Sequence, residues 1–482
     1  MSRTKPMICG NGSCTDRDKV DVKHKRRRQE MIKKILLLSV LIIYATILKA
    51  QDKPNVVFIL ADDLGWGDLQ CYGHPYAKTP ALDKLATEGL RFERFYVTGV
   101  TCCPSRTGFM TSRHPASYPK YMAEYGFAGN ITVTELFKRN GYTTGHFGKW
   151  HIGRDTKNDP VQDGSYGIDE IEVIGGSNSS EGGRDAGLFE EAIKFIEKNK
   201  DKPFYVNIWG HITHYPVDPL ATLVEQFSDV QVKRSDFGEH MQKQFDDSEG
   251  LGGNIEQSMR NYLGDVYSLD LQVGRVIEKL EELGIAGNTI VIFSSDQGPA
   301  PVIVGSHKAQ GKYDITGENT GVIPSQNMLG YAGGLRGGKH TQFEGGVRSP
   351  LIIRWPGKIP ANSLNSTSIV SGMDYLPTIC SLAGIPTGNE PFEGENMADV
   401  WQGSERQRST ALFWRTSSAN AKPSMLEGNW KMHKQGNKYV LYDLSVDEKE
   451  LNDVAHLYPE IVNELSKKME NWVSTLPDSY IK

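Results

Sequence analysis

The amino-acid sequence predicts an α/β protein built on a large, mostly parallel sheet with helices on both faces. Short apolar runs typical of strands buried on both faces occur at residues 55–60, 204–209 and 288–295. Segments with helical periodicity alternate with these runs, the clearest at residues 261–283. Polar residues follow each run directly, so we expect the functional side chains at the carboxyl ends of the strands.

A smaller, antiparallel α+β subdomain is expected at the C-terminus. Strands are predicted near residues 411–415, 430–433 and 439–442, followed by a helix over residues 459–476. With 482 residues the chain can form a large core and a second unit. We predict a catalytic domain over residues 51–384 and the subdomain over residues 385–482.

The first 50 residues predict an extension and an export signal. From Met31 the chain reads MIKKILLLSVLIIYATILKA, a short basic start followed by an apolar run and a small residue, as in a secretory signal peptide. We expect translation to start at Met31 and the mature chain to begin near Gln51, in the periplasm or secreted. The apolar run is too short for a stable membrane span.

The charge distribution argues against nucleic acid as a partner. Residues 1–50 hold 12 of the 54 Lys and Arg but only 4 of the 59 Asp and Glu, so the remainder carries a formal charge of −13. An acidic body repels a polyanion except at a locally basic pocket. The six cysteines are too few and too scattered for a disulfide framework, and none form a C-x-x-C pair.

Two adjacent carboxylates, Asp62 and Asp63, follow the first apolar run. At the end of a buried strand they are costly unless paired or bound to a metal ion. A helix cap or turn is the other interpretation of this pair taken alone.

The stretch TCCPSRTGFMTSR, residues 101–113, combines a thiol with the start of a helix. Pro104 fits the first helical turn, where its missing N–H costs nothing. Cys102 would then face free N–H groups and the positive end of the helix dipole, which favours an anionic reacting group. Taken alone, this cysteine would more often be a buried structural residue.

The pattern C-x-P-S-R, followed by T-G-R, is the signature of type I sulfatases, which belong to the alkaline phosphatase superfamily. The chain resembles this family, with Ser112 in place of the usual glycine. The resemblance implies an alkaline phosphatase-like fold. It also implies that a formylglycine-generating enzyme converts Cys102, the only cysteine with proline two positions later, to formylglycine (3-oxoalanine).

Other family motifs recur along the chain after residue 53. They are the opening P-N with its later D-D, the G-K-W-H of residues 148–151, the histidine before x-P, and the E-G-G-x-R-x-P of residues 344–350. The family's S-D-N-G reads S-D-Q-G here, so Gln297 replaces asparagine. The resemblance implies one calcium ion held by oxygen ligands, which hard cations prefer, together with residue 102: Asp62, Asp63, Cys102, Asp296 and Gln297.

The resemblance also implies a reaction. Calcium, Arg106, Lys149 and Lys339 would neutralise the anionic ester. A hydroxyl of hydrated formylglycine would attack sulfur, with Arg106 orienting the diol. His214 and Lys339 would protonate the leaving alcohol, and His151 would take the proton of the second hydroxyl as sulfate leaves.

The expected substrate is a sulfated carbohydrate derived from a polysaccharide. Segments 217–254 and 299–334, expected to be irregular, flank His214 and Lys339 and could line the pocket. His307, Lys308 and Lys312 could contact further anionic groups or could simply be solvated. The alternatives are a phosphodiesterase or phosphonate monoester hydrolase of the same superfamily, and a non-catalytic glycan-binding protein.

Overall fold

The computed structural model describes residues 28–34, 53–153, 161–173, 182–302, 324–415 and 422–477. Contacts divide the chain into two units, Met1–Lys53 and Pro54–Lys482. In the first unit residues 28–34 form an exposed helix, and most of the predicted signal sequence lies outside the described residues. Among the helices of the described ranges, none combines the length and apolar character needed to cross a membrane.

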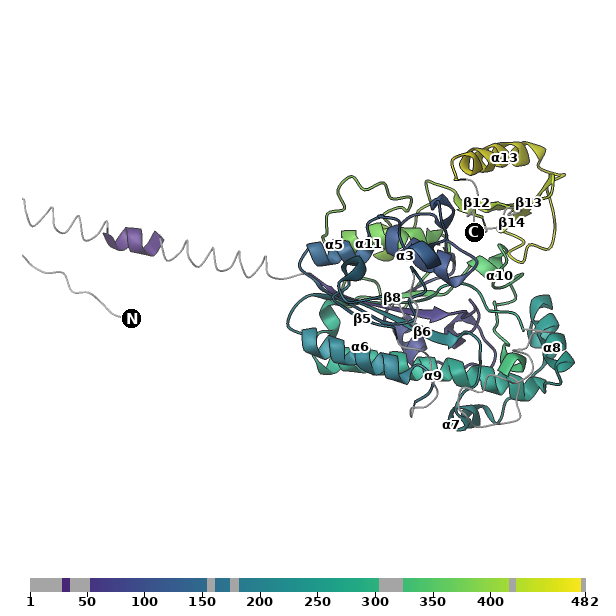
Figure 1. Ribbon diagram of the computed structural model, residues 1–482, viewed down its shortest axis with the longest axis horizontal. Helices are drawn as coiled ribbons and strands as arrows, with labels where there is room; N and C mark the ends of the chain where they lie inside the picture. The colour runs from purple at the N-terminus through teal and green to yellow at the C-terminus, as the bar shows by residue number, and fades with distance from the viewer. Residues whose placement is uncertain are drawn as a thin grey trace, which may run out of the picture. The chain divides into compact units, whose positions relative to one another are not determined.

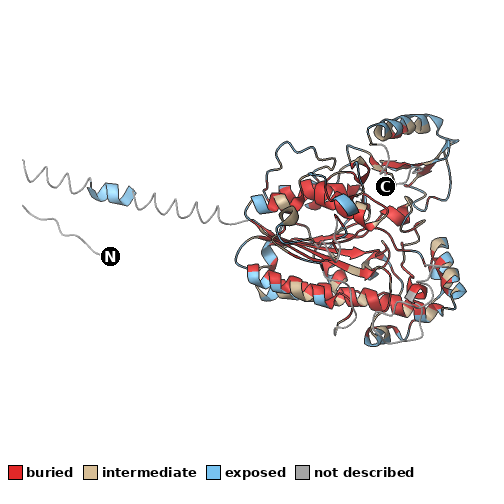
Figure 2. Cartoon of the chain, viewed as in Figure 1, coloured by how far each residue is buried: buried red, intermediate tan, exposed pale blue. Residues whose placement is uncertain are grey.

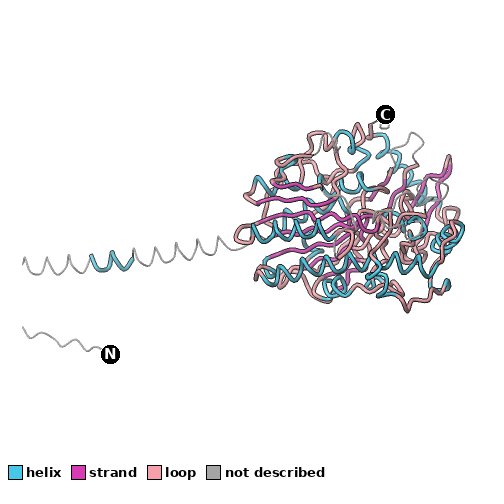
Figure 3. The backbone as a smooth tube through the Cα atoms, turned by 60° about the horizontal axis from the view of Figure 1, so that its bottom comes forward, coloured by secondary structure: helices cyan, strands magenta, loops and turns pink. Residues whose placement is uncertain are grey.

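The second unit is organised around an eight-stranded sheet of order β5-β4-β6-β1-β7-β8-β2-β9 (Figures 1 and 3). Strand β8 runs antiparallel to both its neighbours, and the other neighbours in the sheet are parallel. The predicted α/β architecture with a mostly parallel sheet is therefore confirmed. The strands are β1 (Asn55–Asp62), β2 (Leu90–Phe92), β4 (Thr143–Gly148), β5 (Glu170–Glu172), β6 (Phe204–Thr213), β7 (Thr289–Ser295), β8 (Leu351–Arg354) and β9 (Ser363–Asn365).

Helices cover both faces of this sheet (Figure 1). Helices α6 and α9 pack on one face together with α2, and α3, α5 and α11 pack on the other. Helix α6 buries one side and exposes the other, whereas α3 has no exposed residue (Figure 2). The helices are α2 (Pro80–Thr87), α3 (Cys102–Thr111), α4 (Met122–Tyr125), α5 (Val133–Arg139), α6 (Ala186–Asn199), α7 (Ala221–Val224), α8 (Glu239–Gly250), α9 (Ile255–Glu282), α10 (Glu344–Val347), α11 (Tyr375–Leu382), α12 (Ala398–Trp401) and α13 (Pro459–Ser474).

Strand β1 lies in the middle of the sheet and is buried along its whole length. Alternate side chains enter the two cores: Val57 and Ile59 on the face of α9, Val56 and Phe58 on the face of α3. This explains the continuous apolar run, because both faces of the strand are covered.

The register of the parallel strands brings their carboxyl ends together. Ala61 of β1 lies opposite Ser295 of β7, and Asp62 lies opposite Thr213 of β6. Strand β4 ends beside β6, with Gly148 opposite Trp209. The polar residues that follow β1, β4, β6 and β7 therefore meet at one edge of the sheet.

A four-stranded antiparallel sheet of order β11-β12-β13-β14 lies near the C-terminus. Helix α13 covers one face through Leu465 and Met469, and the other face packs on residues of the main body, including Tyr96. The second strand, β12, was not predicted. The strands are β11 (Leu412–Trp414), β12 (Ser424–Glu427), β13 (Trp430–Gln435) and β14 (Lys438–Asp443), and a two-stranded sheet pairs β3 (Phe95–Tyr96) with β10 (Val370–Ser371).

The expectation of an irregular segment over residues 217–254 was wrong. It contains the short helix α7 and the 12-residue helix α8. Met241 and Phe245 of α8, one helical turn apart, are its buried apolar residues. Two apolar positions in a polar stretch give too weak a periodicity to predict a helix.

Candidate active site

The floor of the site is formed by residues at the carboxyl ends of β1 and β7. Asp63 takes a left-handed backbone conformation, with φ of 64°, and its N–H donates to Asp296 Oδ1 at 3.2 Å. Leu64 N donates to Ser295 Oγ at 3.0 Å. These contacts turn the chain sharply after β1, so Asp62, Asp63 and Asp296 face one another with almost no exposed surface.

Cys102 is the first residue of α3 and lies over this floor. Its Sγ donates to Asp62 Oδ1 at 3.3 Å, and Lys149 Nζ and Lys339 Nζ lie 3.4 Å and 3.7 Å from it. Burial, together with the charge of Asp62, raises the pKa of the Cys102 thiol. A negative charge at this position therefore needs a compensating cation.

Arg106 lies one turn further along α3 and is fully buried. Its Nε and Nη2 both contact Asp296 Oδ2, at 2.9 Å and 2.8 Å. Its Nη1 donates to the carbonyl of Lys149 at 2.9 Å, and the guanidinium lies 5.1 Å from the centre of the Trp209 ring. Arg106 thus ties the helix start to the ends of β4 and β7.

Two lysines complete the cluster of charges. Lys149 Nζ donates to Asp62 Oδ2 at 2.5 Å, and Lys339 Nζ donates to Asp63 Oδ2 at 2.8 Å. Burial lowers the pKa of Lys339, but the negative charges around it, those of Asp63, Cys102 and Asp62, together more than offset this, so the pKa is raised and the lysine stays protonated.

Asp62 and Asp296 do not titrate alike. Burial raises the pKa of Asp62, but the neighbouring cations, Lys149 foremost, lower it well below its usual value. Burial and the charge of Asp62 raise the pKa of Asp296 to about 7. Like charges this close disfavour full ionisation of the cluster, and a cation among them removes that penalty.

These residues fit a hard divalent cation. One ligand atom each from Asp62, Asp63, Cys102 and Asp296 lies within 4.8 Å of the others. The Gln297 Nε2 donates to Asp63 Oδ1 and to Cys102 Sγ, while its Oε1 is buried without a hydrogen-bond partner. A 180° rotation of the amide exchanges these atoms and turns the free oxygen toward the cluster. Carboxylate and amide oxygens are the ligands that calcium prefers.

His214 lies on the open side of the site. Its Nε2 is 3.9 Å from Asp63 Oδ2, and its Nδ1 donates to the carbonyl of Tyr215 at 2.8 Å. This leaves Nε2 free to exchange a proton with a ligand. His211, the other histidine of this segment, pairs with Asp185 at 3.2 Å instead.

His151 follows β4 with φ of 64° and is exposed. Although the residue keeps exposed surface, partial burial of the ring, with the charge of Lys149, lowers the pKa of its imidazole to about 4, so the ring is neutral near pH 7. A neutral imidazole can accept a proton.

Two charged residues that sequence reasoning missed hold the His214 segment. Arg184 Nη1 donates to the carbonyls of His214 and Pro216 at 2.6 Å and 2.8 Å. Asp185 Oδ2 accepts from the backbone N–H of His211 and of Ile212 at 2.7 Å and 3.0 Å. A charged pair before a helix gives no local signal that it binds another loop, so only the fold shows this role.

Ser112, the departure from the signature, ends α3 in the left-handed conformation with φ of 54°. Glycine adopts this conformation without strain. Here the serine hydroxyl accepts from Gly394 N at 3.1 Å, and the serine carbonyl accepts from Glu393 N at 2.8 Å. These two contacts stabilise the strained conformation and fasten the helix end to segment 393–394.

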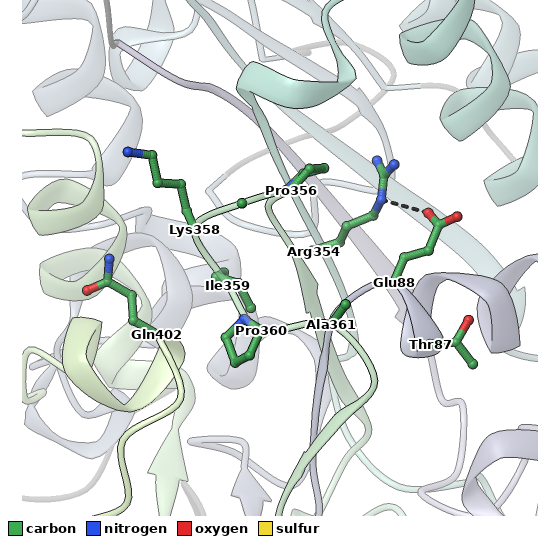
Figure 4. A pocket seen from close by; sticks show the side chains of 10 residues that line it. Thr87, Glu88, Arg354, Pro356, Lys358, Ile359, Pro360, Ala361 and Gln402 are labelled. Atoms are coloured by element: carbon green, nitrogen blue, oxygen red, sulfur yellow. Dashed lines mark ion pairs between the residues drawn. The ribbon is translucent and has the colours of Figure 1, made fainter.

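Of the expected substrate-contacting residues, His307, Lys308 and Lys312 lie outside the described ranges. A separate pocket of about 690 Å³ is lined by residues around the end of β8. In Figure 4 Arg354 points toward Glu88, to which it is ion-paired at 2.8 Å, and Lys358 extends away from that pair. The pocket is lined by none of the predicted catalytic or metal-binding residues.

The family model of the sulfatases matches residues 54–385, which include every predicted site residue. The chain belongs to the sulfatase family. It is therefore a sulfuric ester hydrolase. A second model, described as N-sulphoglucosamine sulphohydrolase, C-terminal, matches residues 338–475.

Curated relatives and solved structures agree with this assignment. The chain is 29% identical to arylsulfatase A of Homo sapiens, with 89% of each chain covered. It is 27% identical to N-acetylgalactosamine-6-O-sulfatase of Bacteroides thetaiotaomicron, covering 87% of this chain and 93% of that protein. The structure of Ps i-CgsB in complex with k-i-k-neocarrahexaose shares the fold, with a TM-score of 0.71, 23% identity, and 89% and 94% of the two chains covered.

Proposed function

We propose that this sulfatase is exported and hydrolyses sulfate esters of carbohydrate fragments, with formylglycine at position 102 and one calcium ion. The observation that carries the proposal is the convergence of three carboxylates and three cationic side chains on Cys102 at the start of α3. Such a site neutralises both an anionic ester and an anionic nucleophile.

Calcium would be held by Asp62, Asp63, Asp296 and Gln297 and would supply Lewis acidity and positive charge at the reacting sulfate. Hydrated formylglycine would supply two hydroxyls, one to attack sulfur and one to release sulfate afterwards. Conversion of Cys102 requires a formylglycine-generating enzyme as a maturation partner.

The chain's own residues would bind the ester and move protons. Lys149 and Lys339 flank Sγ of Cys102, so both can bind sulfate oxygens, while Arg106 keeps residue 102 and Asp296 in place. The protonated Lys339 would give its proton to the leaving alcohol oxygen. His214 would share this role only as an imidazolium, because in the neutral ring the proton is on Nδ1, which donates to the carbonyl of Tyr215. The neutral His151 would accept the proton of the second hydroxyl.

Carbohydrate is the proposed substrate because proteins similar to this chain act on or bind carbohydrates. The Bacteroides relative is named for N-acetylgalactosamine 6-sulfate, and the Ps i-CgsB structure holds an oligosaccharide. The acidic body limits binding of a polyanion to the locally basic site.

The proposal is tested by measuring sulfate release from a panel of substrates. The protein is coexpressed with a formylglycine-generating enzyme so that Cys102 can be converted. The panel contains N-acetylgalactosamine 6-sulfate, N-acetylglucosamine 6-sulfate, carrageenan oligosaccharides, 4-nitrophenyl sulfate and 4-nitrophenyl phenyl phosphate. We expect turnover of at least one sulfated sugar, none by Cys102→Ala, and formylglycine in the tryptic peptide by mass spectrometry. Turnover of the phosphodiester with no sulfated sugar cleaved would contradict the proposal, as would full activity with an unmodified thiol.

Export has a separate test. A chain lacking residues 1–50 should fold and be active, and the native host should hold the mature protein outside its cytoplasm. Recovery of the chain in the cytoplasm with residues 1–30 attached would refute the predicted start at Met31.

A further inference from the structure

Glu450, in the segment after the C-terminal sheet, is bonded to two points of the loop that carries Lys339. Its carboxylate accepts from the backbone N–H of Glu344 through Oε2 at 2.6 Å and contacts His433 Nε2 through Oε1 at 2.6 Å. Its carbonyl accepts from Arg336 Nη1 at 2.8 Å. One residue of the C-terminal unit therefore holds two points of the loop, one on each side of Lys339.

Glu450 is itself fixed in place. It is fully buried and takes a left-handed conformation with φ of 53°, which is uncommon for a residue other than glycine. An ionised carboxylate is retained in a buried position only when its oxygens are bonded. Here each oxygen of the carboxylate has a donor or a histidine nitrogen beside it.

The loop end at Glu344 has a second tie to the C-terminal sheet. Lys431 Nζ of β13 donates to Glu344 Oε1 at 2.8 Å, and Tyr96 OH donates to Oε2 at 2.8 Å. Both charged side chains are completely buried. Breaking one partner of such a pair is costly because the other charge stays buried alone.

One backbone contact closes the loop that carries Lys339, and two others join its middle to neighbouring segments. Gly345 N donates to the carbonyl of Arg336 at 2.8 Å, which closes the loop at its base. Lys339 N donates to Pro299 O at 2.9 Å, and His340 N donates to Val100 O at 2.9 Å, two residues before Cys102. The position of the ammonium beside Asp63 and Cys102 thus depends on these direct contacts together with a loop base whose two sides are both bonded to Glu450.

We propose that Glu450 is a positioning residue that acts through Lys339, so that the C-terminal sheet sets the geometry of proton donation to the leaving alcohol. This rests on the proposed role of Lys339 in the function above. Loss of Glu450 lets the loop base open and moves the ammonium away from the leaving oxygen. A displacement of about 1 Å in a catalytic group can cost on the order of 100-fold in rate.

The leaving group separates positioning from general destabilisation. A sugar alkoxide must be protonated as it leaves, whereas 4-nitrophenolate is a good leaving group without a proton. We expect Glu450→Ala to lower kcat about 10- to 100-fold for the sugar sulfate that the wild type cleaves fastest in the panel. With 4-nitrophenyl sulfate the fall in kcat should be at least about threefold smaller, because only the contact of Lys339 with the sulfate is then disturbed and no proton transfer is needed.

A double-mutant cycle with Lys339→Ala is the decisive measurement. If Glu450 acts through Lys339, Glu450→Ala lowers kcat for the sugar sulfate in the wild type but has no further effect in Lys339→Ala. An equal loss in both backgrounds, or no loss in either, overturns the proposal. The cycle tests the role of Glu450 even if 4-nitrophenyl sulfate is not turned over. A wild type that is inactive on every sulfate ester would contradict the proposed function instead.

Two further variants and a control keep the test independent of folding. Glu450→Gln keeps the length and one acceptor for Glu344 N, so kcat should stay within about threefold of wild type. The aspartate of Glu450→Asp is too short to reach both partners, so this variant should lower kcat as Glu450→Ala does. If Glu450→Ala does not fold, Glu450→Asp takes its place in the double-mutant cycle. Glu448→Ala removes an exposed carboxylate two residues away that pairs with Arg348 at 2.9 Å, and kcat should not change. Equal activity of Glu450→Asp and wild type on both substrates also overturns the proposal.

Discussion

The floor and the open side of the site are built in different ways. The floor consists of residues at the carboxyl ends of β1 and β7, so the register of two central, buried strands places Asp62 and Asp296. On the open side, His214 and Lys339 lie on segments held by charged residues from elsewhere in the chain, Asp185 and Glu450.

The two parts of the site should therefore respond differently to substitutions. The sheet that positions the floor is stabilised by two large apolar cores, so a single polar substitution there changes the chemistry more than the geometry. The open side depends on a few hydrogen bonds to buried charges, so removing one of them shifts a loop. The four predictions below test this contrast, from the largest expected effect to the smallest.

Asp296→Ala should abolish activity. It removes a proposed calcium ligand and also the partner of Arg106, at 2.8 Å, so the electrostatic organisation of the floor is lost. We expect kcat/KM to fall more than about 100-fold and the metal content to fall with it, measured by kinetics and by elemental analysis. Normal metal content together with a normal rate would remove Asp296 from the site.

Removal of divalent cations should inactivate the wild type reversibly. Chelation leaves three carboxylates with mutual repulsion, as the raised pKa of Asp296 indicates. Calcium should restore activity and raise Tm, because a ligand that binds only the folded state stabilises it by about 2.7 kcal/mol at 100 times its Kd. The Tm shift should be absent in Asp296→Ala, and a chelated enzyme with full activity would contradict the calcium assignment.

Asp185→Ala should weaken catalysis without emptying the metal site. It frees the backbone N–H groups of His211 and Ile212 and loosens the segment of His214. We expect kcat to fall about 10- to 100-fold, as for other residues that orient a catalytic group, with unchanged calcium content. Asp201→Ala, in the turn after α6, is a matched control that should leave kcat unchanged. Loss of calcium from Asp185→Ala would show that floor and open side are not independent.

Gln297→Asn should have the smallest effect. It keeps the amide oxygen that is buried without a partner here and restores the residue of the family signature on a shorter side chain. We expect kcat/KM to change less than about tenfold, since neighbouring ligands can shift by part of an ångström. Gln297→Leu, similar in size but without the oxygen, should lose calcium affinity, and equal affinity of both variants would exclude Gln297 as a ligand.

The contrast also explains which elements could be predicted from the sequence. Strands β1, β6 and β7 were predicted because strands buried on both faces are apolar at every position. Helix α8 and strand β12 were missed. Helix α8 buries few apolar residues, and β12 has only four residues, so neither shows a clear period.

The reactive residues of the floor and of α3 could be identified from the sequence alone, because they lie close together in it: Asp62 with Asp63, Asp296 with Gln297, and Cys102 with Arg106. Their placement follows from strand ends and a helix start, which are local features. The residues that hold the segments of His214 and Lys339 could be found only in the folded structure. Asp185 lies 26 residues from His211 in the sequence, and Glu450 lies 106 residues from Glu344. Contacts over such separations depend on how the sheets and helices pack, and a local pattern carries no trace of them.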